Sequence, residues 1–184
     1  GAKTLFGDLP GPHFLYVGRV AVEKNIGAFL ELDLPGSKMV VGDGPALAEL
    51  KRTHPDVHFA GMLSGEPLAE AYGGADVFVF PSRTDTYGIV LLEALASGLP
   101  VAAYPVPGPL DVIGDAPVGV LDNDLAKAAR SALSLSPADC RDHALRYSWR
   151  KSAEQFLQNL VPVCGTEPAP VTPSAANIPV ERAG

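Results

Sequence analysis

Short, continuously apolar runs alternate with helix-like segments along most of this chain, and this alternation constrains the fold more than any other feature. We predict strands over residues 13–17, 38–41, 57–60, 77–80, 101–103 and 118–120. A strand that lacks polar alternation is buried on both of its faces. Helices must therefore cover both sides of the sheet, which predicts an α/β fold with a doubly wound parallel sheet of about six strands.

Capping residues indicate where several of the intervening helices begin. We predict helices over residues 25–32, 46–52, 64–71, 89–97 and 123–133, a further helix that opens at 136–137, and a last one over 148–160. Ser64, Asn123 and Ser148 are typical N-cap residues. Pro137, which follows Ser136, stands at the favoured first position of a helix.

These elements predict one domain over residues 13–161, flanked by two segments without a core of their own. Apolar residues make up 47% of the chain and charged residues 19%, which is enough to bury a core. We expect residues 1–12 to be a linker that arrives from a missing amino-terminal domain. Residues 162–184 contain five prolines and no sustained periodicity, which predicts a disordered tail.

The charge balance and the cysteine count argue against several classes of protein. The chain has 21 acidic and 14 basic residues, a formal net charge of -7, so a nucleic-acid footprint or a polybasic membrane patch is not expected. Cys140 and Cys164 lie far apart without a Cys-x-x-Cys pattern, which fits a reducing cytoplasm better than a disulfide framework. The four histidines are scattered, and we predict neither a metal site nor a cofactor.

The loop after the first predicted strand carries two cations. A parallel sheet binds its ligands beyond the carboxyl ends of its strands, and this loop begins with Gly18 and contains Arg19 and Lys24. A guanidinium fork and a mobile ammonium group suit a diphosphate. A solvated loop in which Arg19 pairs with Glu23 is the alternative, and the spacing alone leaves both open.

A glycine-rich loop, Gly42-Asp-Gly-Pro45, follows the second predicted strand. Gly42 and Gly44 match the first two glycines of a dinucleotide fingerprint, but Leu47 stands at the third. We therefore predict a tight turn whose backbone edge is open to a ligand.

The loop after the fourth predicted strand is the richest in chemistry. Gly88, Ile89 and Val90 stand where a helix begins, so their backbone N–H groups would face an anion. Asp85 precedes that helix, and Glu93 follows eight residues later among apolar sequence neighbours. A carboxylate in apolar surroundings needs partners, and the vicinal hydroxyls of a sugar would supply two. The alternative is that Asp85 caps the helix and Glu93 faces solvent.

Four motifs together point to a family. They are Tyr16-Val-Gly-Arg19 with Glu23-Lys24, then Val41-Gly-Asp-Gly-Pro45, then Ala75-Asp-Val-Phe-Val-Phe-Pro-Ser82, and finally Thr84-Asp-Thr-Tyr-Gly-Ile-Val-Leu-Leu-Glu-Ala94 followed by Gly98-Leu-Pro-Val101. In this order and spacing they resemble the carboxyl-terminal, Rossmann-like half of a retaining glycosyltransferase of family 4, which has the GT-B fold. The resemblance covers residues 14–160.

The resemblance implies roles for individual residues. Arg19 and Lys24 would hold the donor diphosphate and, together with Asp85, form the catalytic set. Asp85 and Glu93 match the family's E-x7-E acids, so Glu93 would bind the donor ribose and Asp85 the hydroxyls of the transferred sugar. Asp85 is one methylene shorter than the commoner Glu. The other donor-binding residues would be Gly18, Gly42, Leu63, Tyr87, Gly88, Ile89 and Val90, with residues 61–63 beside the nucleobase.

The resemblance also implies an activity. The whole enzyme would move a hexose from a UDP- or GDP-sugar to a lipid or saccharide acceptor, without a metal. The acceptor would bind through the missing amino-terminal domain, so these 184 residues alone would bind a nucleotide sugar and transfer nothing. The Thr84-Asp-Thr86 variant resembles family members that glycosylate lipids. This leaves open peripheral association of a cytoplasmic enzyme with the inner face of a membrane.

Two other functions share this architecture. A stand-alone nucleotide-binding module needs no chemistry of its own, and half of a sugar-nucleotide epimerase has the same GT-B fold. The acid pair Asp85 and Glu93 argues against the epimerase. An α/β domain encoded upstream would favour the transferase.

Overall fold

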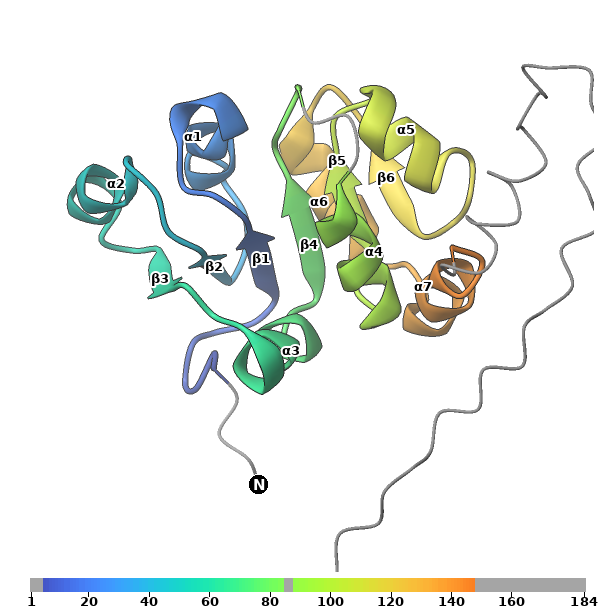
Figure 1. Cartoon of the computed structure of the whole chain (residues 1–184), viewed down its shortest axis with the longest axis horizontal. Coiled ribbons are helices and arrows are strands. Elements are labelled where there is room, and N and C mark those ends of the chain that lie inside the picture. The colour runs from blue at the N-terminus through green and yellow to red at the C-terminus, as the bar shows by residue number, and fades with distance from the viewer. Residues whose placement is uncertain (1–4, 85–87, 148–184) are drawn as a thin grey trace, which may run out of the picture.

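The computed structural model describes residues 5–84 and 88–147, and in this part of the chain six parallel strands form one sheet. The strands are β1 His13–Val17, β2 Ser37–Val41, β3 His58–Gly61, β4 Val77–Phe80, β5 Val101–Ala103 and β6 Gly119–Leu121. They lie in the order β3-β2-β1-β4-β5-β6 (Figure 1). The predicted doubly wound α/β fold is confirmed, and each strand lies within one residue of its prediction.

Helices connect the strands throughout the described residues. They are the 3-10 helix η1 Val22–Lys24 and the α-helices α1 Ile26–Leu30, α2 Leu47–Thr53, α3 Gly65–Gly73, α4 Ile89–Ala96, α5 Pro107–Ile113, α6 Leu125–Ala132 and α7 Pro137–Ala144. α7 begins at Pro137 as predicted, and Ser136 caps it, whereas Ser64 precedes α3 without a side-chain cap bond. The predicted helix over 148–160 and the predicted tail lie outside the described residues.

Three predictions about helices need correction. The first helix starts after Asn25, because this residue adopts a left-handed conformation with φ of 53° and separates η1 from α1. The cap of α6 is Asp124, whose side chain accepts a backbone N–H of the first turn, and not Asn123. No helix was predicted at α5, since Pro-Gly-Pro is typical of a turn. Pro107 instead lies at the start of the helix, where its missing N–H costs nothing.

Both faces of the sheet are covered, as the unbroken apolar runs require. On one face Leu15 and Phe78 pack with residues of α3, α4, α5 and α7. On the other face Phe14 and Val77 pack with residues of α1, α2 and α6. Successive residues of one strand therefore enter two different cores, which explains why these strands lack polar alternation.

Side-chain hydrogen bonds close the amino edge of the sheet, the edge at which its parallel strands begin. Phe6 is 1% exposed and stacks on the ring of His13 with 4.3 Å between the ring centroids. The backbone N–H of His13 donates to Asp76 Oδ2 at 2.7 Å, and Ser37 Oγ donates to the carbonyl oxygen of Pro10 at 2.7 Å. Part of the predicted linker thus packs against this edge.

Backbone hydrogen bonds join the loops at the opposite, carboxyl edge. The N–H of Gly18 donates to the carbonyl of Val41 at 3.0 Å, and the N–H of Val20 donates to the carbonyl of Asp43 at 2.9 Å. A Cβ atom at Gly42 would overlap the carbonyl oxygen of Gly18. The glycine is therefore required by the close contact of two loops, in agreement with the predicted tight turn.

Candidate functional site

The candidate site lies beyond the carboxyl ends of β1 and β4, where the winding of the sheet reverses. The chain winds from β1 through β2 to β3 on one side, and from β4 through β5 to β6 on the other. Loops diverge at such a switch point and leave a crevice that binds ligands in open α/β sheets. A hollow of about 450 Å³, here called the switch cavity, is lined by Tyr16, Val17, Gly18, Arg19, Lys24, Phe80, Ser82, Gly88, Ile89 and Val90.

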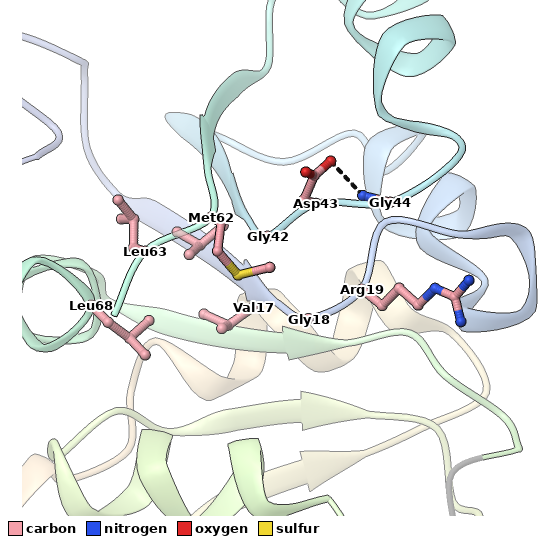
Figure 2. Close-up of a pocket in the computed structure, with 10 residues that line it drawn as sticks. Val17, Gly18, Arg19, Gly42, Asp43, Gly44, Met62, Leu63 and Leu68 are labelled. Atoms are coloured by element: carbon pink, nitrogen blue, oxygen red, sulfur yellow. Dashed lines mark hydrogen bonds between the residues drawn. The ribbon is translucent and has the colours of Figure 1, made fainter. Parts of the chain in front are cut away.

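A larger hollow of about 740 Å³, here called the apolar pocket, adjoins the switch cavity over the ends of β1, β2 and β3. It is lined by Val17, Gly18, Arg19, Val41, Gly42, Asp43, Gly44, Met62, Leu63 and Leu68. Figure 2 shows Val17, Met62, Leu63 and Leu68 gathered around it from β1, the loop after β3 and α3. The two hollows share three residues at the end of β1, so one ligand with an apolar part and an anionic part can occupy both.

Both predicted cations line the switch cavity. Arg19 and Glu23 form a long ion pair, with 3.6 Å between Nη1 and Oε1, and their side chains are 63% and 57% exposed. Figure 2 shows the Arg19 side chain directed away from Leu63 and Leu68. The surface pair foreseen as the alternative is therefore present. An exposed pair of this kind contributes at most about 1 kcal/mol, so a diphosphate can displace Glu23.

The start of α4 forms the opposite wall of the switch cavity. Gly88 is the N-cap residue rather than part of the first turn, and its carbonyl accepts the N–H of Leu91 at 2.9 Å. The first N–H groups of a helix have no intrahelical acceptor. Ile89 and Val90, which line the cavity, thus supply backbone donors at the positive end of an eight-residue helix.

Glu93 is exposed on α4 and has a partner that the sequence did not reveal. The hydroxyl of Tyr72, on α3, donates to Glu93 Oε2 at 2.9 Å. Burial, followed by the nearby Glu93 carboxylate, raises the pKa of Tyr72 well above its ordinary value, so the phenol stays a hydrogen-bond donor. Glu93 therefore faces solvent, as the alternative interpretation of the sequence held, and the hydrogen bond from Tyr72 orients its carboxylate.

The structure brings eight of the eleven predicted donor-binding residues into the two hollows. They are Gly18, Arg19, Lys24, Gly42, Leu63, Gly88, Ile89 and Val90. Glu93 lies one helical turn beyond Ile89 and Val90, on the same side of α4 by helical spacing. Asp85 and Tyr87 lie outside the described residues.

Sequence reasoning missed Tyr72 and Ser82 as residues of the site. A largely buried tyrosine needs a partner for its hydroxyl, and that rule marks Tyr72 as notable without naming Glu93, which is 21 residues away. Ser82 was noticed only as part of the motif that ends β4. Its burial within the lining of the switch cavity depends on the tertiary fold.

The chain belongs to the glycosyl transferases group 1 family, whose model matches residues 11–136. The structure has the fold of one Rossmann-like half of a GT-B glycosyltransferase. The matched region contains every strand and both hollows.

Named relatives support this membership. The chain is 42% identical over 108 residues to a GDP-mannose-dependent alpha-mannosyltransferase of Mycobacterium tuberculosis, which covers 58% of this chain and 29% of the relative. It is 36% identical over 173 residues to the alpha-monoglucosyldiacylglycerol synthase of Streptococcus pneumoniae, covering 85% and 37%. A solved sucrose-phosphate synthase from Thermosynechococcus elongatus superposes with a TM-score of 0.67 at 29% identity, covering 82% of this chain and 44% of that one. The chain thus spans less than half the length of each of these relatives.

The described residues show neither a membrane-spanning helix nor a cluster of metal-ligand side chains. None of the described helices is long and apolar enough to cross a membrane. No three acidic, histidine or cysteine side chains gather there as a metal-binding group would. Asp122 and Asp124, the single Asp-x-Asp of the sequence, have other partners: Asp122 pairs with Lys127 at 2.5 Å and Asp124 caps α6.

Proposed function

We propose that this chain is the donor-binding domain of a retaining, family 4 glycosyltransferase and binds a UDP- or GDP-sugar across the two hollows. The observation that carries the proposal is the pairing of cations with a helix start across the switch cavity. Arg19 and Lys24 come from the loop after β1, and Ile89 and Val90 bring backbone N–H groups from α4. These donors match a diphosphate.

The apolar pocket is proposed to hold the nucleobase end of the nucleoside. Its walls are mostly apolar, with Leu63, Leu68 and the exposed Met62 on the side away from the Arg19 guanidinium. Glu93 lies on α4 one helical turn beyond Ile89 and Val90, and one of its carboxylate oxygens accepts the bond from Tyr72. Its other oxygen is suited to accept hydrogen bonds from the ribose hydroxyls, as the family resemblance implies.

The proposed chemistry is departure of a nucleoside diphosphate from the anomeric carbon of the donor. As the bond between the anomeric carbon and the phosphate oxygen breaks, negative charge grows on the diphosphate. Arg19, Lys24 and the start of α4 stabilise that charge, because fixed donors need not reorganise during the reaction. In this proposal these protein groups replace a metal ion, and Asp85 contacts hydroxyls of the transferred sugar.

A second domain is proposed to supply the acceptor side of the cleft. The relatives named above are more than twice as long as the region they share with this chain. Their names include a mannosyltransferase that depends on GDP-mannose and a synthase of a glucosyl lipid. We therefore propose hexose transfer to a lipid or saccharide acceptor by the whole enzyme, with UDP and GDP tested as alternatives.

Titration calorimetry of this chain with UDP, GDP, uridine and guanosine tests the proposal. For one nucleotide we expect binding of roughly -4 to -6 kcal/mol, weak because one wall of the cleft is missing. Arg19→Ala and Lys24→Ala should each weaken binding of the nucleoside diphosphate by about 1.5–3 kcal/mol. Binding of the nucleoside should stay nearly unchanged. Equal losses for nucleoside and diphosphate would overturn the assignment of the cations to the phosphates.

A further inference from the structure

Ser82 is a buried hydroxyl with an unmet hydrogen bond. The residue is 1% exposed, and its Oγ has no partner among the described residues. Buried polar side chains in native proteins nearly always have a partner, because an unpaired one keeps the full penalty of leaving water. Such an exception in the wall of a cavity points to a partner that arrives with a ligand.

One carbonyl next to Ser82 in sequence and one in the cavity wall already accept other donors. The carbonyl of Pro81 accepts the side-chain amide of Asn25 at 3.0 Å. The carbonyl of Arg19 accepts the hydroxyl of Tyr16 at 2.8 Å. Reorientation of Ser82 toward these groups would give it only a shared acceptor, so the protein does not offer the hydroxyl a bond of its own there.

The chemistry of the cavity wall defines the ligand. Besides Ser82, the wall contributes a guanidinium, an ammonium and the backbone donors at the start of α4. Its described lining residues include no carboxylate. A wall that presents cations and N–H donors, with no carboxylate among its described lining residues, fits an oxygen-rich anion better than a neutral sugar, whose hydroxyls would also need acceptors.

We propose that Ser82 Oγ donates a hydrogen bond to a phosphate oxygen of the bound nucleoside diphosphate. This proposal rests on the proposed function of the site. It adds Ser82 to the phosphate-binding residues that the family resemblance implies. No covalent step is involved: the hydroxyl keeps its proton and stabilises the charge that grows on the leaving diphosphate. Ser82 then binds the same group as Arg19 and Lys24, from the end of β4.

Ser37 provides a matched control at the other edge of the sheet. It is also buried, at 8% exposure, but its Oγ donates to the carbonyl of Pro10 at 2.7 Å. Removing that hydroxyl breaks its hydrogen bond to Pro10, whereas removing the hydroxyl of Ser82 breaks no hydrogen bond. The two substitutions should therefore act in opposite ways on stability and on binding.

The experiment compares Ser82→Ala and Ser37→Ala with the unmodified chain, using thermal unfolding and calorimetric titration with UDP, GDP and the two nucleosides. We expect Ser82→Ala to keep or raise the melting temperature and to weaken the diphosphate roughly tenfold, with the nucleoside unchanged. Ser37→Ala should lower the melting temperature and leave the affinity unchanged.

Three results would overturn the proposal. Equal diphosphate affinity in Ser82→Ala and the unmodified chain would exclude the phosphate contact, and the proposed function would survive. An equal loss for nucleoside and diphosphate, or a lower melting temperature, would show that Ser82 supports the fold instead. Failure of the unmodified chain to bind either UDP or GDP would overturn the proposed function and this proposal with it.

Discussion

The two edges of the sheet are built from the same strands but held together in different ways. At the amino edge, side chains satisfy backbone groups: Ser37 binds the Pro10 carbonyl, and Lys38 Nζ donates to the carbonyls of Leu30 and Leu32. At the carboxyl edge, side-chain donors also bind carbonyl groups, and backbone hydrogen bonds in addition join the glycine-rich loops after β1 and β2.

The difference extends to what each edge leaves unsatisfied. The carboxyl edge exposes Val22, Met62 and Ile89, at 86%, 72% and 60% exposure, and contains the unpartnered hydroxyl of Ser82. The amino edge instead buries Phe6 almost completely. The comparison indicates that one edge supplies stability, whereas the other keeps donors and apolar surface available for a ligand.

The largest effect is expected from Phe6→Ala, which attacks the stable edge. Phe6 is fully buried against the ring of His13, so its truncation should cost about 3–5 kcal/mol of unfolding free energy. Urea unfolding followed by circular dichroism measures this loss. Val22→Ala, at an 86% exposed position of the other edge, is the control and should stay within about 0.5 kcal/mol. A loss below about 1 kcal/mol for Phe6→Ala would refute a stabilising amino edge.

The next effect is expected at the ligand edge, from Glu93→Ala. Loss of a charge-assisted bond to the ribose should weaken the nucleotide by about 1.5–3 kcal/mol. Stability should also fall, by about 1 kcal/mol, because the hydroxyl of the buried Tyr72 loses its acceptor. Calorimetry with UDP and GDP is the measurement, and unchanged affinity for whichever nucleotide binds would rule out the ribose role.

Most of the fold follows from local sequence patterns. Unbroken apolar runs specify strands buried on both faces, and Gly42 reveals a loop that approaches another backbone closely. The parallel pairing of β1 with β4 also follows from the rules of doubly wound sheets. α5 escaped prediction because Pro107 at a helix start and proline in a turn look the same in one sequence.

The unpredicted parts of the site depend on contacts between distant residues. The bond from Tyr72 to Glu93 joins two helices, and no spacing rule connects them. The apolar neighbours of Glu93 in sequence suggested a buried acid, yet a helix turns successive residues by about 100° and exposes one of them. The missing partner of Ser82 is a property of the whole cavity wall.

A smaller effect than that of Glu93→Ala is expected from Tyr72→Phe, which keeps the ring and removes the bond to Glu93. Nucleotide binding should weaken by about 1 kcal/mol, because the carboxylate loses its fixed orientation. The loss should vanish with a 2′,3′-dideoxynucleoside diphosphate, which has no hydroxyl for Glu93. Tyr147→Phe is the control, since its hydroxyl donates to the backbone carbonyls of Asp111 and Val112 in α5, and neither residue lines a hollow. An equal loss with the dideoxy ligand would show that Tyr72 acts through packing.

The smallest effect is expected from Met62→Ala, and it separates binding from stability most cleanly. Met62 is 72% exposed, so it adds little to the fold, yet it lines the apolar pocket beside Leu63. A nucleobase in that pocket would cover its side chain, and truncation should weaken uridine or guanosine by about 0.5–1 kcal/mol through lost apolar contact. Leu145→Ala is matched in exposure, at 74%, and lies at the end of α7, so it should leave binding unchanged. Calorimetry with the nucleoside alone isolates the effect from the phosphates. Of these two exposed residues, only Met62 lines the apolar pocket, so only its truncation should remove contact with a base bound there. If the Met62→Ala and Leu145→Ala variants bind the nucleoside equally well, the base does not occupy the apolar pocket.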